Sequence, residues 1–437
     1  MNYINMNILL LLCLSFISSS YISLHFDTLI GNLTSSNIKN ILPYNYIYTS
    51  ICVGSPSQCF NLNIELQNPL LSIIGSSYNS SSYPKYDSSK SSTYKEGEYK
   101  TFKRSEPAPL EGEIVIFNFA GYESTDTLTI ADKTISNISF INVDKNFISD
   151  NLKVNSGILG LDLRLSEGVS KEMMLINQLK KNNVIDDDVF YIEYKDEHKG
   201  NLIIGEYPHK VSSSFKEENA KETYAYTFLN EVFWGINFNS IKLNNSEIEY
   251  DFKVSMFSIE SGFILAPNPV LTQLNKTFFK DYIEKGFCKE EEGDFESFSC
   301  EDTNNVNFES FPTLSFYHKE INMTFSFDYS DLFYKFEGRR YCLIFGNYDP
   351  FLDTYWILGK PFFIKYKTFF RPDSKRIGFY EIEPSKPFNF WWILLLVASL
   401  IIIGLLIYIV VFVLTKKRKK RAIELDDDYE YIPKLNV

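Results

Sequence analysis

A pattern that occurs twice in the 437-residue chain constrains its fold most strongly. A strand-like run ends in a carboxylate at Glu65 (NIELQ) and again at Glu260 (SIESG), and each is followed later by an Ile-Leu-Gly run, in GILGL and WILGK. This spacing is far longer than the unit of a solenoid repeat. Frequent Phe and Tyr residues in alternating runs favour strands over helices. The sequence therefore predicts an all-β, bilobal fold in which each lobe presents one carboxylate to a central cleft.

Both ends of the chain are predicted to be targeting segments. Residues 1–20 contain the short apolar run Ile8–Ile17 followed by three serines, which is typical of a secretory signal peptide. Residues 390–414 are almost wholly apolar and long enough to cross a bilayer as a single transmembrane helix. The basic run Lys416–Arg421 follows at once, so the tail, residues 415–437, is expected in the cytosol. These features predict a single-pass type I membrane protein of the secretory pathway or cell surface.

The ectodomain is long enough for two lobes, which we place at residues 21–208 and 209–388 because the chain becomes polar and charged near this boundary. The formal net charge of −12 argues against nucleic acid as a partner. The four histidines have neither metal-ligand spacing nor a nucleophile motif nearby, so we expect no metal or cofactor. We expect a monomer.

Cysteines and glycosylation motifs also fit a secreted ectodomain. Cys52 and Cys59 flank the turn VGSPSQ and would face each other in a hairpin, which predicts a disulfide. An odd number of ectodomain cysteines leaves one thiol over. Cys288 is the candidate, although it could compete with Cys300. Asn-X-Ser/Thr acceptors that predict a glycoprotein occur at Asn32, Asn79, Asn137, Asn244, Asn275 and Asn322.

Several segments between Tyr46 and Ile382 together resemble the pepsin-like aspartic proteases. VGSPSQCF resembles the first hairpin of that family, YDSSKSSTYK resembles the serine-rich segment before the flap, and KRIGFY resembles the final strand. SGILGL and WILGKPFF resemble the two segments that brace the active-site loops. The resemblance implies a pepsin-like (acid protease) fold, and it also implies a disulfide between Cys300 and Cys342.

The catalytic motifs depart from that family. Its two lobes each contribute Asp-Thr/Ser-Gly, and the two aspartates share one proton and a water. Here the equivalents of the two catalytic Asp residues are Glu65 and Glu260, in the loops Glu65-Leu66-Gln67 and Glu260-Ser261-Gly262. Each glutamate is one methylene longer than aspartate, and displacements of this order are costly to catalysis. Leu66 lacks the hydroxyl that joins the loops in the family, and Gln67 replaces a glycine needed for a tight turn.

The flap region departs as well. The resemblance places Ile114 where the family has its flap tyrosine, and Phe117 lies in the same region, where EIVIFNFAG has no glycine pair.

Three functions stay open. The one we favour is a non-proteolytic or severely impaired homologue that binds an extended peptide or protein segment in its cleft, because no acid–base scheme explains Leu66 and Gln67. The second is an active but atypical endopeptidase that uses Glu65 and Glu260. The third is an adhesin or receptor on the same scaffold. Whether the chain is an enzyme is therefore not decided by the sequence.

Overall fold

The computed structural model describes residues 20–29, 34, 37–79, 83–106, 115–145, 156–164, 170–228, 231–248, 253–291, 293, 295–346, 355–381 and 390–427. The predicted signal peptide, apart from Ser20, lies outside the described residues, as does Ile114. The chain divides into two compact units, Met1–Glu381 and Ile382–Val437.

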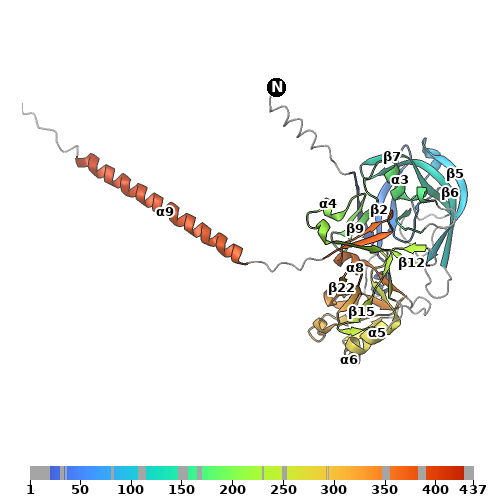
Figure 1. Ribbon diagram of the computed structural model, residues 1–437. Helices are drawn as coiled ribbons and strands as arrows, with labels where there is room; N and C mark the ends of the chain where they lie inside the picture. The colour runs from blue at the N-terminus through green and yellow to red at the C-terminus, as the bar shows by residue number, and fades with distance from the viewer. Residues whose placement is uncertain are drawn as a thin grey trace, which may run out of the picture. The chain divides into compact units, whose positions relative to one another are not determined.

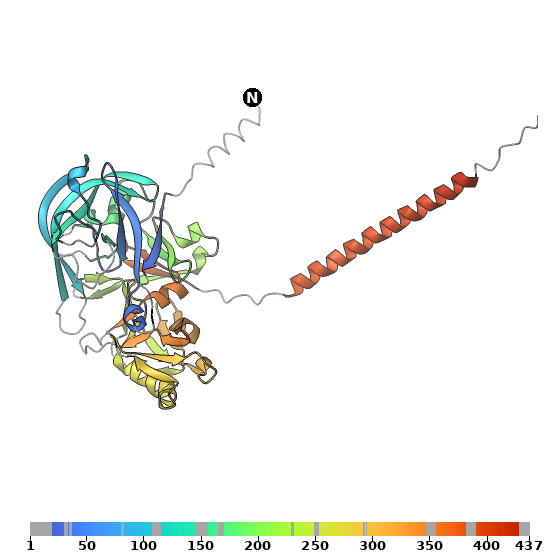
Figure 2. The same ribbon diagram turned by 180° about the vertical axis from the view of Figure 1, so that it is seen from behind.

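Strands dominate the first unit, in which Figures 1 and 2 show two strand-rich lobes. The largest sheet has the strand order β11 (Ala220–Tyr224), β28 (Arg376–Tyr380), β27 (Thr368–Arg371), β9 (Phe190–Tyr194), β10 (Lys199–Ile204), β1 (Ile22–Leu29), β2 (Tyr46–Val53), β3 (Gln58–Glu65), β8 (Gly157–Gly160), β4 (Leu71–Ile74), β7 (Lys133–Lys145), β6 (Val115–Ile130) and β5 (Lys95–Glu106). Strands from the end of this unit, β27 and β28, thus pair into the same sheet as β9. The lobe boundary at residues 208 and 209 stays a prediction.

Smaller sheets form the second lobe. The first has the order β14 (Gly235–Asn237), β17 (Val254–Phe257), β26 (Trp356–Leu358), β18 (Ile264–Ala266) and β25 (Ile344–Gly346). The second has the order β16 (Ser246–Glu247), β15 (Ser240–Leu243), β21 (Leu314–His318) and β22 (Met323–Phe327), and the third has the order β19 (Cys288–Glu291), β20 (Ser297–Glu301), β24 (Arg339–Cys342) and β23 (Phe333–Phe336). The strands β12 (Tyr226–Phe228) and β13 (Glu231–Phe233) form a two-stranded sheet.

Helices in the first unit are short. They are α2 (Ile38–Ile41), α3 (Leu175–Lys181), α4 (Pro208–Val211), α5 (Asn268–Leu274), the π-helical η4 (Asn275–Phe279), α6 (Lys280–Glu284), α7 (Tyr329–Leu332) and α8 (Lys360–Lys365), with 3₁₀ turns η1 (Ser88–Lys90), η2 (Lys171–Met173), η3 (Glu217–Asn219) and η5 (Phe308–Ser310). The predicted all-β, bilobal fold is confirmed.

The duplicated sequence pattern folds into the same pairing twice. In the first lobe β8 lies between β3 and β4, parallel to β3 and antiparallel to β4. In the second lobe β26 lies between β17 and β18, again parallel to the first and antiparallel to the second. Each Ile-Leu-Gly strand therefore lies beside the strand that leads into a carboxylate loop.

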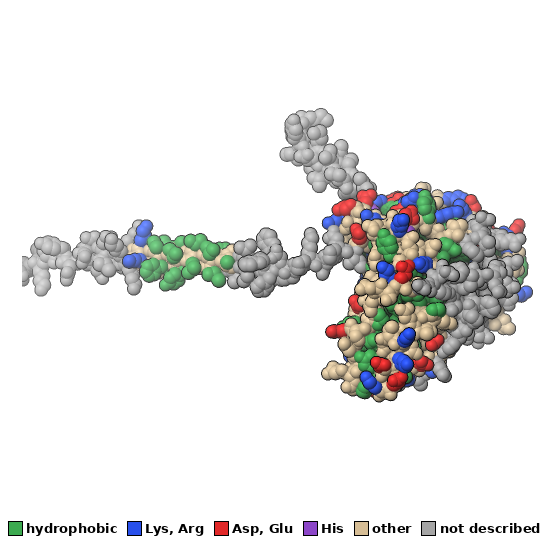
Figure 3. All heavy atoms as spheres, turned by 60° about the horizontal axis from the view of Figure 1, so that its bottom comes forward, with side chains coloured by type: hydrophobic (Ala, Val, Ile, Leu, Met, Phe, Trp, Pro, Cys, Tyr) green, Lys and Arg blue, Asp and Glu red, His purple; other side chains and the backbone are tan. Residues whose placement is uncertain are grey.

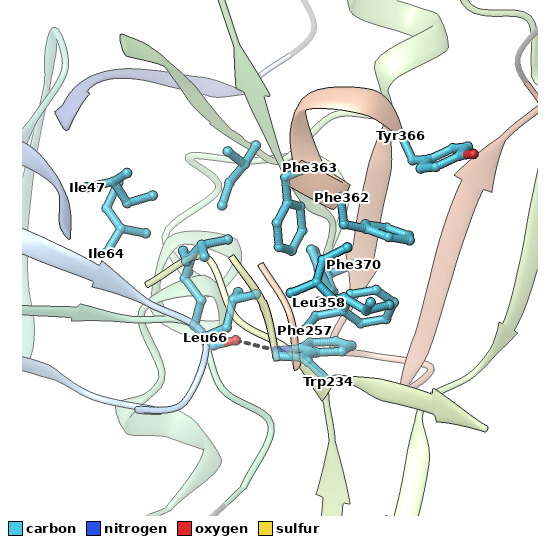
Figure 4. Close-up of a cluster of buried hydrophobic side chains, with 14 of the residues drawn as sticks. Ile47, Ile64, Leu66, Trp234, Phe257, Leu358, Phe362, Phe363, Tyr366 and Phe370 are labelled. Carbon is cyan, nitrogen blue, oxygen red and sulfur yellow. Dashed lines mark hydrogen bonds between the residues drawn. The ribbon is translucent and has the colours of Figure 1, made fainter. Parts of the chain in front are cut away.

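One hydrophobic cluster joins strands of both lobes. Figure 4 shows Leu66, Trp234, Phe257, Leu358 and Phe370 among the side chains of this cluster. The Trp234 indole nitrogen donates a hydrogen bond to the Leu161 carbonyl (2.7 Å), so a second-lobe side chain is fixed directly to the first lobe. Aromatic rings of this size dominate the energetics of such a core.

The β2–β3 hairpin forms as predicted. Side chains of β2 alternate, with Ile47, Ile51 and Val53 buried on one face. Its register places Cys52 opposite Cys59, and the two form the expected disulfide, with Cα atoms 3.9 Å apart.

The second disulfide differs from the one implied by the resemblance. Cys288 bonds Cys300, so the Cys300–Cys342 pairing is wrong, and Cys288 is not the leftover thiol. The reason is strand register: β19 and β20 place Cys288 directly opposite Cys300, whereas β24 places Arg340 there. Cys342 is a buried free thiol. Disulfides of this kind are typical of secreted and extracellular proteins.

The second unit contains the helix α9 (Phe390–Asp427). It is the helix among the described residues that is long and apolar enough to span a membrane, over Ala398–Arg418 with a mean hydropathy of 2.9. Figure 3 shows apolar side chains along this helix and basic ones beside them. The helix continues beyond the predicted span, residues 390–414, so the start of the predicted cytosolic tail is helical.

Candidate functional site

The first carboxylate loop begins where β3 ends. Glu65 lies opposite Gly160 of β8, and its carbonyl accepts a hydrogen bond from the Leu161 N–H (2.9 Å). The Glu65 side chain is only 3 % exposed. Leu66 is buried in the shared hydrophobic cluster (Figure 4). The leucine side chain at this position therefore adds to the core and offers no hydrogen-bonding group.

A buried ion pair supports this loop from behind. Arg164 Nε lies 2.6 Å from Asp162 Oδ2, and both side chains are buried. Arg164 Nη2 also donates to the Gln67 carbonyl (3.1 Å), and its guanidinium lies over the Phe233 ring. Burial raises the pKa of Asp162, and Arg164 opposes that rise. The pair thus fixes the backbone of Gln67.

Backbone hydrogen bonds complete the support. The Asp162 N–H donates to the Asn68 carbonyl (3.0 Å), and the Gly160 N–H donates to the Leu70 carbonyl (3.1 Å). A Cβ atom on Gly160 would lie 2.2 Å from the Asn68 carbonyl oxygen, so only glycine fits there. The loop is therefore closely packed against the end of β8.

The second loop follows β17 and reaches the first. Glu260 Oε1 accepts a hydrogen bond from the backbone N–H of Leu66 (2.8 Å), although the two residues are 194 positions apart. Glu260 Oε2 accepts from the Ser258 hydroxyl (2.8 Å), and Ser261 Oγ donates to Ser258 Oγ (3.1 Å). Both carboxylate oxygens of Glu260 are therefore bound by the protein, and one of these bonds joins the two loops.

The chain before β2 packs against this second loop. The Gly262 N–H donates to the Pro43 carbonyl (2.9 Å), and a Cβ on Gly262 would lie 2.0 Å from the Leu42 carbonyl oxygen. Asn45 donates to the Glu260 carbonyl through its N–H (2.7 Å) and to the Ile259 carbonyl through its amide (2.7 Å). The second loop is thus fixed from both of its sides.

Two tyrosines lie close to the carboxylates. The Asn45 amide also donates to the Tyr194 hydroxyl (2.7 Å). Burial raises the pKa of Tyr194, and the charge of Glu260 adds to this. Burial raises the pKa of Tyr46 to about 12, and Tyr44 and then Glu65 add to the shift. Both phenols are therefore neutral at neutral pH.

The structure brings most of the predicted site residues together. The Leu66 N–H of the first loop meets Glu260 of the second, while Gln67 contributes its carbonyl to Arg164. Phe117 lies in β6 opposite Arg104. Its side chain and Ile114 are outside what the structure describes, so the flap assignments stay predictions, as do the catalytic roles.

Sequence reasoning missed four supporting residues, Asn45, Asp162, Arg164 and Tyr194. A signal for Asp162 and Arg164 existed, because two opposite charges directly follow the apolar run GILGL. Charges in such a place are rarely buried unless they are paired. Asn45 and Tyr194 gave no comparable signal.

The family model described as eukaryotic aspartyl protease matches residues 45–382. No curated protein matches the chain significantly.

Proposed function

Because the chain belongs to the eukaryotic aspartyl protease family, we propose that it is a membrane-anchored member that binds extended peptides between its lobes and cleaves them slowly or not at all. The observation that carries the proposal is the hydrogen bond from the Leu66 N–H to Glu260 Oε1. It gives this carboxylate a structural task in place of a catalytic one.

Aspartic proteolysis needs two carboxylates that share a proton and hold a water. A general acid or base must lie within hydrogen-bond reach of the group that it serves. Glu260 uses both of its oxygens on Leu66 and Ser258. Moving its carboxylate away from the first loop would leave the Leu66 N–H unsatisfied, which costs about 1–3 kcal/mol for a buried group. This cost opposes the rearrangement that catalysis would need.

Leu66 explains why Glu260 has this task. A hydroxyl at that position would offer a bond between the loops, whereas the leucine side chain is buried among apolar groups. The longer glutamate reaches the backbone of the opposite loop instead. The two substitutions support each other, and the loops stay joined without a catalytic dyad.

Binding tests the proposal directly. The full-length protein in a nonionic detergent would be titrated with a library of extended peptides, with binding followed by fluorescence anisotropy. We expect saturable binding by a subset of sequences. Leu66→Ala, which leaves a cavity beside the loops, should weaken that binding, whereas Val211→Ala on α4 should not. Absence of saturable binding by any peptide would contradict the proposal.

The second candidate function is an active endopeptidase that uses Glu65 and Glu260. The observation that favours it is the duplicated topology, in which both carboxylates stand at the ends of equivalent strands. Rapid peptide cleavage that is lost on Glu65→Gln and on Glu260→Gln would establish this alternative.

We also propose a type I orientation in the secretory pathway or at the cell surface, with the chain acting as a monomer. The apolar span of α9 and the two disulfides support it. Protease treatment of intact cells should digest any first unit at the cell surface and spare a C-terminal epitope tag, whereas treatment of intact secretory vesicles should remove the tag and spare the first unit. Digestion of the tag in intact cells, or of the first unit in intact secretory vesicles, would contradict this orientation.

A further inference from the structure

A pocket of about 190 Å³ lies beside the second carboxylate loop and has no part in the proposed function. Its lining comes from α2 and the segment between α2 and β2, from α7 and β23, from α8 and from the β9–β10 turn. Gly262 is its contact with the loop. The apolar part of its wall is formed by Ile41, Leu42, Phe333, Pro361 and Ile364.

Lys360 provides a cation in this apolar wall. It is the first residue of α8 and is partly buried. Its ammonium makes no hydrogen bond or ion pair with the residues that the structure describes. Burial lowers the pKa of Lys360, and the more distant charges of Glu197 and Asp196 oppose this shift. A partly buried cation of this kind lacks a close counter-ion, which an anionic ligand can supply.

The two acids that line the pocket do not act as a close counter-ion for Lys360. Asp331 already accepts hydrogen bonds from Lys365 Nζ (2.5 Å) and from the Asp328 N–H (2.9 Å), so its charge is balanced. Glu197 is exposed on the β9–β10 turn. Of the charges that oppose the effect of burial on the pKa of Lys360, that of Glu197 is the largest. The pocket thus has one partly buried cation in its wall and one exposed acid on a turn.

We propose that this pocket binds a ring-sized apolar group that carries a carboxylate, with Lys360 as its counter-ion. A cavity of about 150 Å³ accommodates benzene. The volume of about 190 Å³ therefore leaves room for an aromatic ring and a short arm. Phe333 and Tyr334 supply aromatic surface for the ring. Such a group occurs in a free aryl-alkyl acid and in the C-terminal phenylalanine of a peptide.

The probes are matched pairs that differ only in charge. Full-length protein in a nonionic detergent would be titrated by calorimetry with 3-phenylpropionate and with its neutral amide. A short peptide ending in phenylalanine would be compared with its C-terminal amide. We expect each acid to bind at least about tenfold more tightly than its amide, a difference of about 1.4 kcal/mol. Binding of the free acid alone points to a small molecule, and binding of the peptide acid as well points to a chain terminus. Equal affinity of acid and amide overturns the proposal.

Two substitutions that remove charges of opposite sign should change the affinity in opposite directions. Lys360→Gln should weaken binding of 3-phenylpropionate about tenfold or more, and Glu197→Gln should tighten it, because it removes a repelling charge. Lys319→Gln, at an exposed site in the β21–β22 turn, makes the same charge change outside the pocket and should leave binding unchanged. Glu197 is exposed on a turn, so its substitution tests the proposal even if Lys360→Gln folds poorly. Weakening by Lys319→Gln as large as by Lys360→Gln, or no tightening by Glu197→Gln, would refute the assignment.

Discussion

At the scale of single residues, Glu260 shows what one extra methylene changes. It reaches across to the Leu66 N–H while its other oxygen accepts from Ser258. A hydroxyl at this position of the first loop could make a bond between the loops, but Leu66 has none, and its side chain is buried in the core. The pair has exchanged a side-chain contact for a carboxylate–backbone contact, and the loops remain joined.

This exchange predicts the effect of removing the carboxylate. Glu260→Ala should lower the free energy of unfolding by about 1–3 kcal/mol, because the Leu66 N–H loses its acceptor. Glu260→Gln keeps an acceptor oxygen and should cost less. Urea unfolding followed by tryptophan fluorescence measures both. Equal stability of wild type and Glu260→Ala would show that the bond between the loops is not made in solution.

Asp126 predicts a pH dependence of stability. It is buried and accepts hydrogen bonds from Tyr86 (2.5 Å), Thr93 (2.5 Å) and the Thr127 N–H (2.7 Å). Burial raises its pKa, but the hydrogen bonds from Thr93, Tyr86 and Ser91 outweigh burial, so the pKa lies below 3.8, the ordinary value for aspartate.

A carboxyl group whose pKa is lower in the folded state stabilises the fold fully when the pH is above its pKa in the unfolded state. It loses that contribution as the pH falls through its pKa in the folded state. The stability advantage of wild type over Asp126→Asn should therefore be largest near neutral pH. It should shrink as the pH drops below 3.8. Urea unfolding of both proteins across this range measures the difference. A difference that does not change with pH would contradict the assignment.

At the scale of elements, each carboxylate loop depends on a glycine at the end of an Ile-Leu-Gly strand. A Cβ on Gly359 would lie 2.2 Å from the Phe263 carbonyl oxygen and 2.4 Å from that of Ser261. Gly160 meets the first loop in the same way. The two strands therefore set the position of both loops through close backbone contact.

Gly359→Ala should consequently displace the second loop. Overpacking of this kind costs about 1–3 kcal/mol, and backbone oxygens cannot rotate away as side chains do. Gly286→Ala is a suitable comparison, because open space surrounds that glycine and only its positive φ opposes a side chain. Thermal unfolding should show the larger loss for Gly359→Ala. The reverse order would indicate that the loop relaxes freely.

Strand register and burial predict the reactivity of the cysteines in the first unit. Cys342 should react with iodoacetamide only after unfolding, because burial raises its pKa to about 12. Mass spectrometry of the unreduced protein should recover Cys52 linked to Cys59 and Cys288 linked to Cys300. Recovery of a peptide in which Cys300 is linked to Cys342 would contradict this prediction and support the pairing implied by the resemblance.

The sequence predicted the structural features that depend on residues close together in the chain. Residues on either side of one short turn determine the Cys52–Cys59 pair. The duplicated strand-acid and Ile-Leu-Gly runs predicted two similar lobes, and the structure adds the pairing of β3 with β8 and of β17 with β26. The partner of Cys300 depends on the register of neighbouring strands, which composition does not determine. The Glu260–Leu66 bond joins residues 194 positions apart, so only the folded chain reveals it.

At the scale of the whole molecule, the first unit is held together by a core that both lobes share. Trp234 packs against Phe190 and Phe370, and its indole binds the Leu161 carbonyl. Because one hydrophobic cluster spans the strands of both lobes, we expect them to unfold together.

Trp234→Ala tests this coupling. It should lower the free energy of unfolding by about 3–5 kcal/mol, as large-to-small substitutions of buried aromatics do. The transition should remain single when it is monitored by circular dichroism. Val211→Ala, at a partly exposed site on α4, should change stability little. Two separated transitions in the wild-type protein would show that the lobes unfold independently.

Cleavage of peptides tests the central claim most directly. The full-length protein would be incubated with a diverse peptide pool from acidic to neutral pH, and the products would be identified by mass spectrometry. Because Glu260 joins the loops and Leu66 supplies no hydroxyl, we predict that wild type forms products slowly or not at all. Rapid cleavage by wild type that is lost in each single variant, Glu65→Gln and Glu260→Gln, would contradict the account.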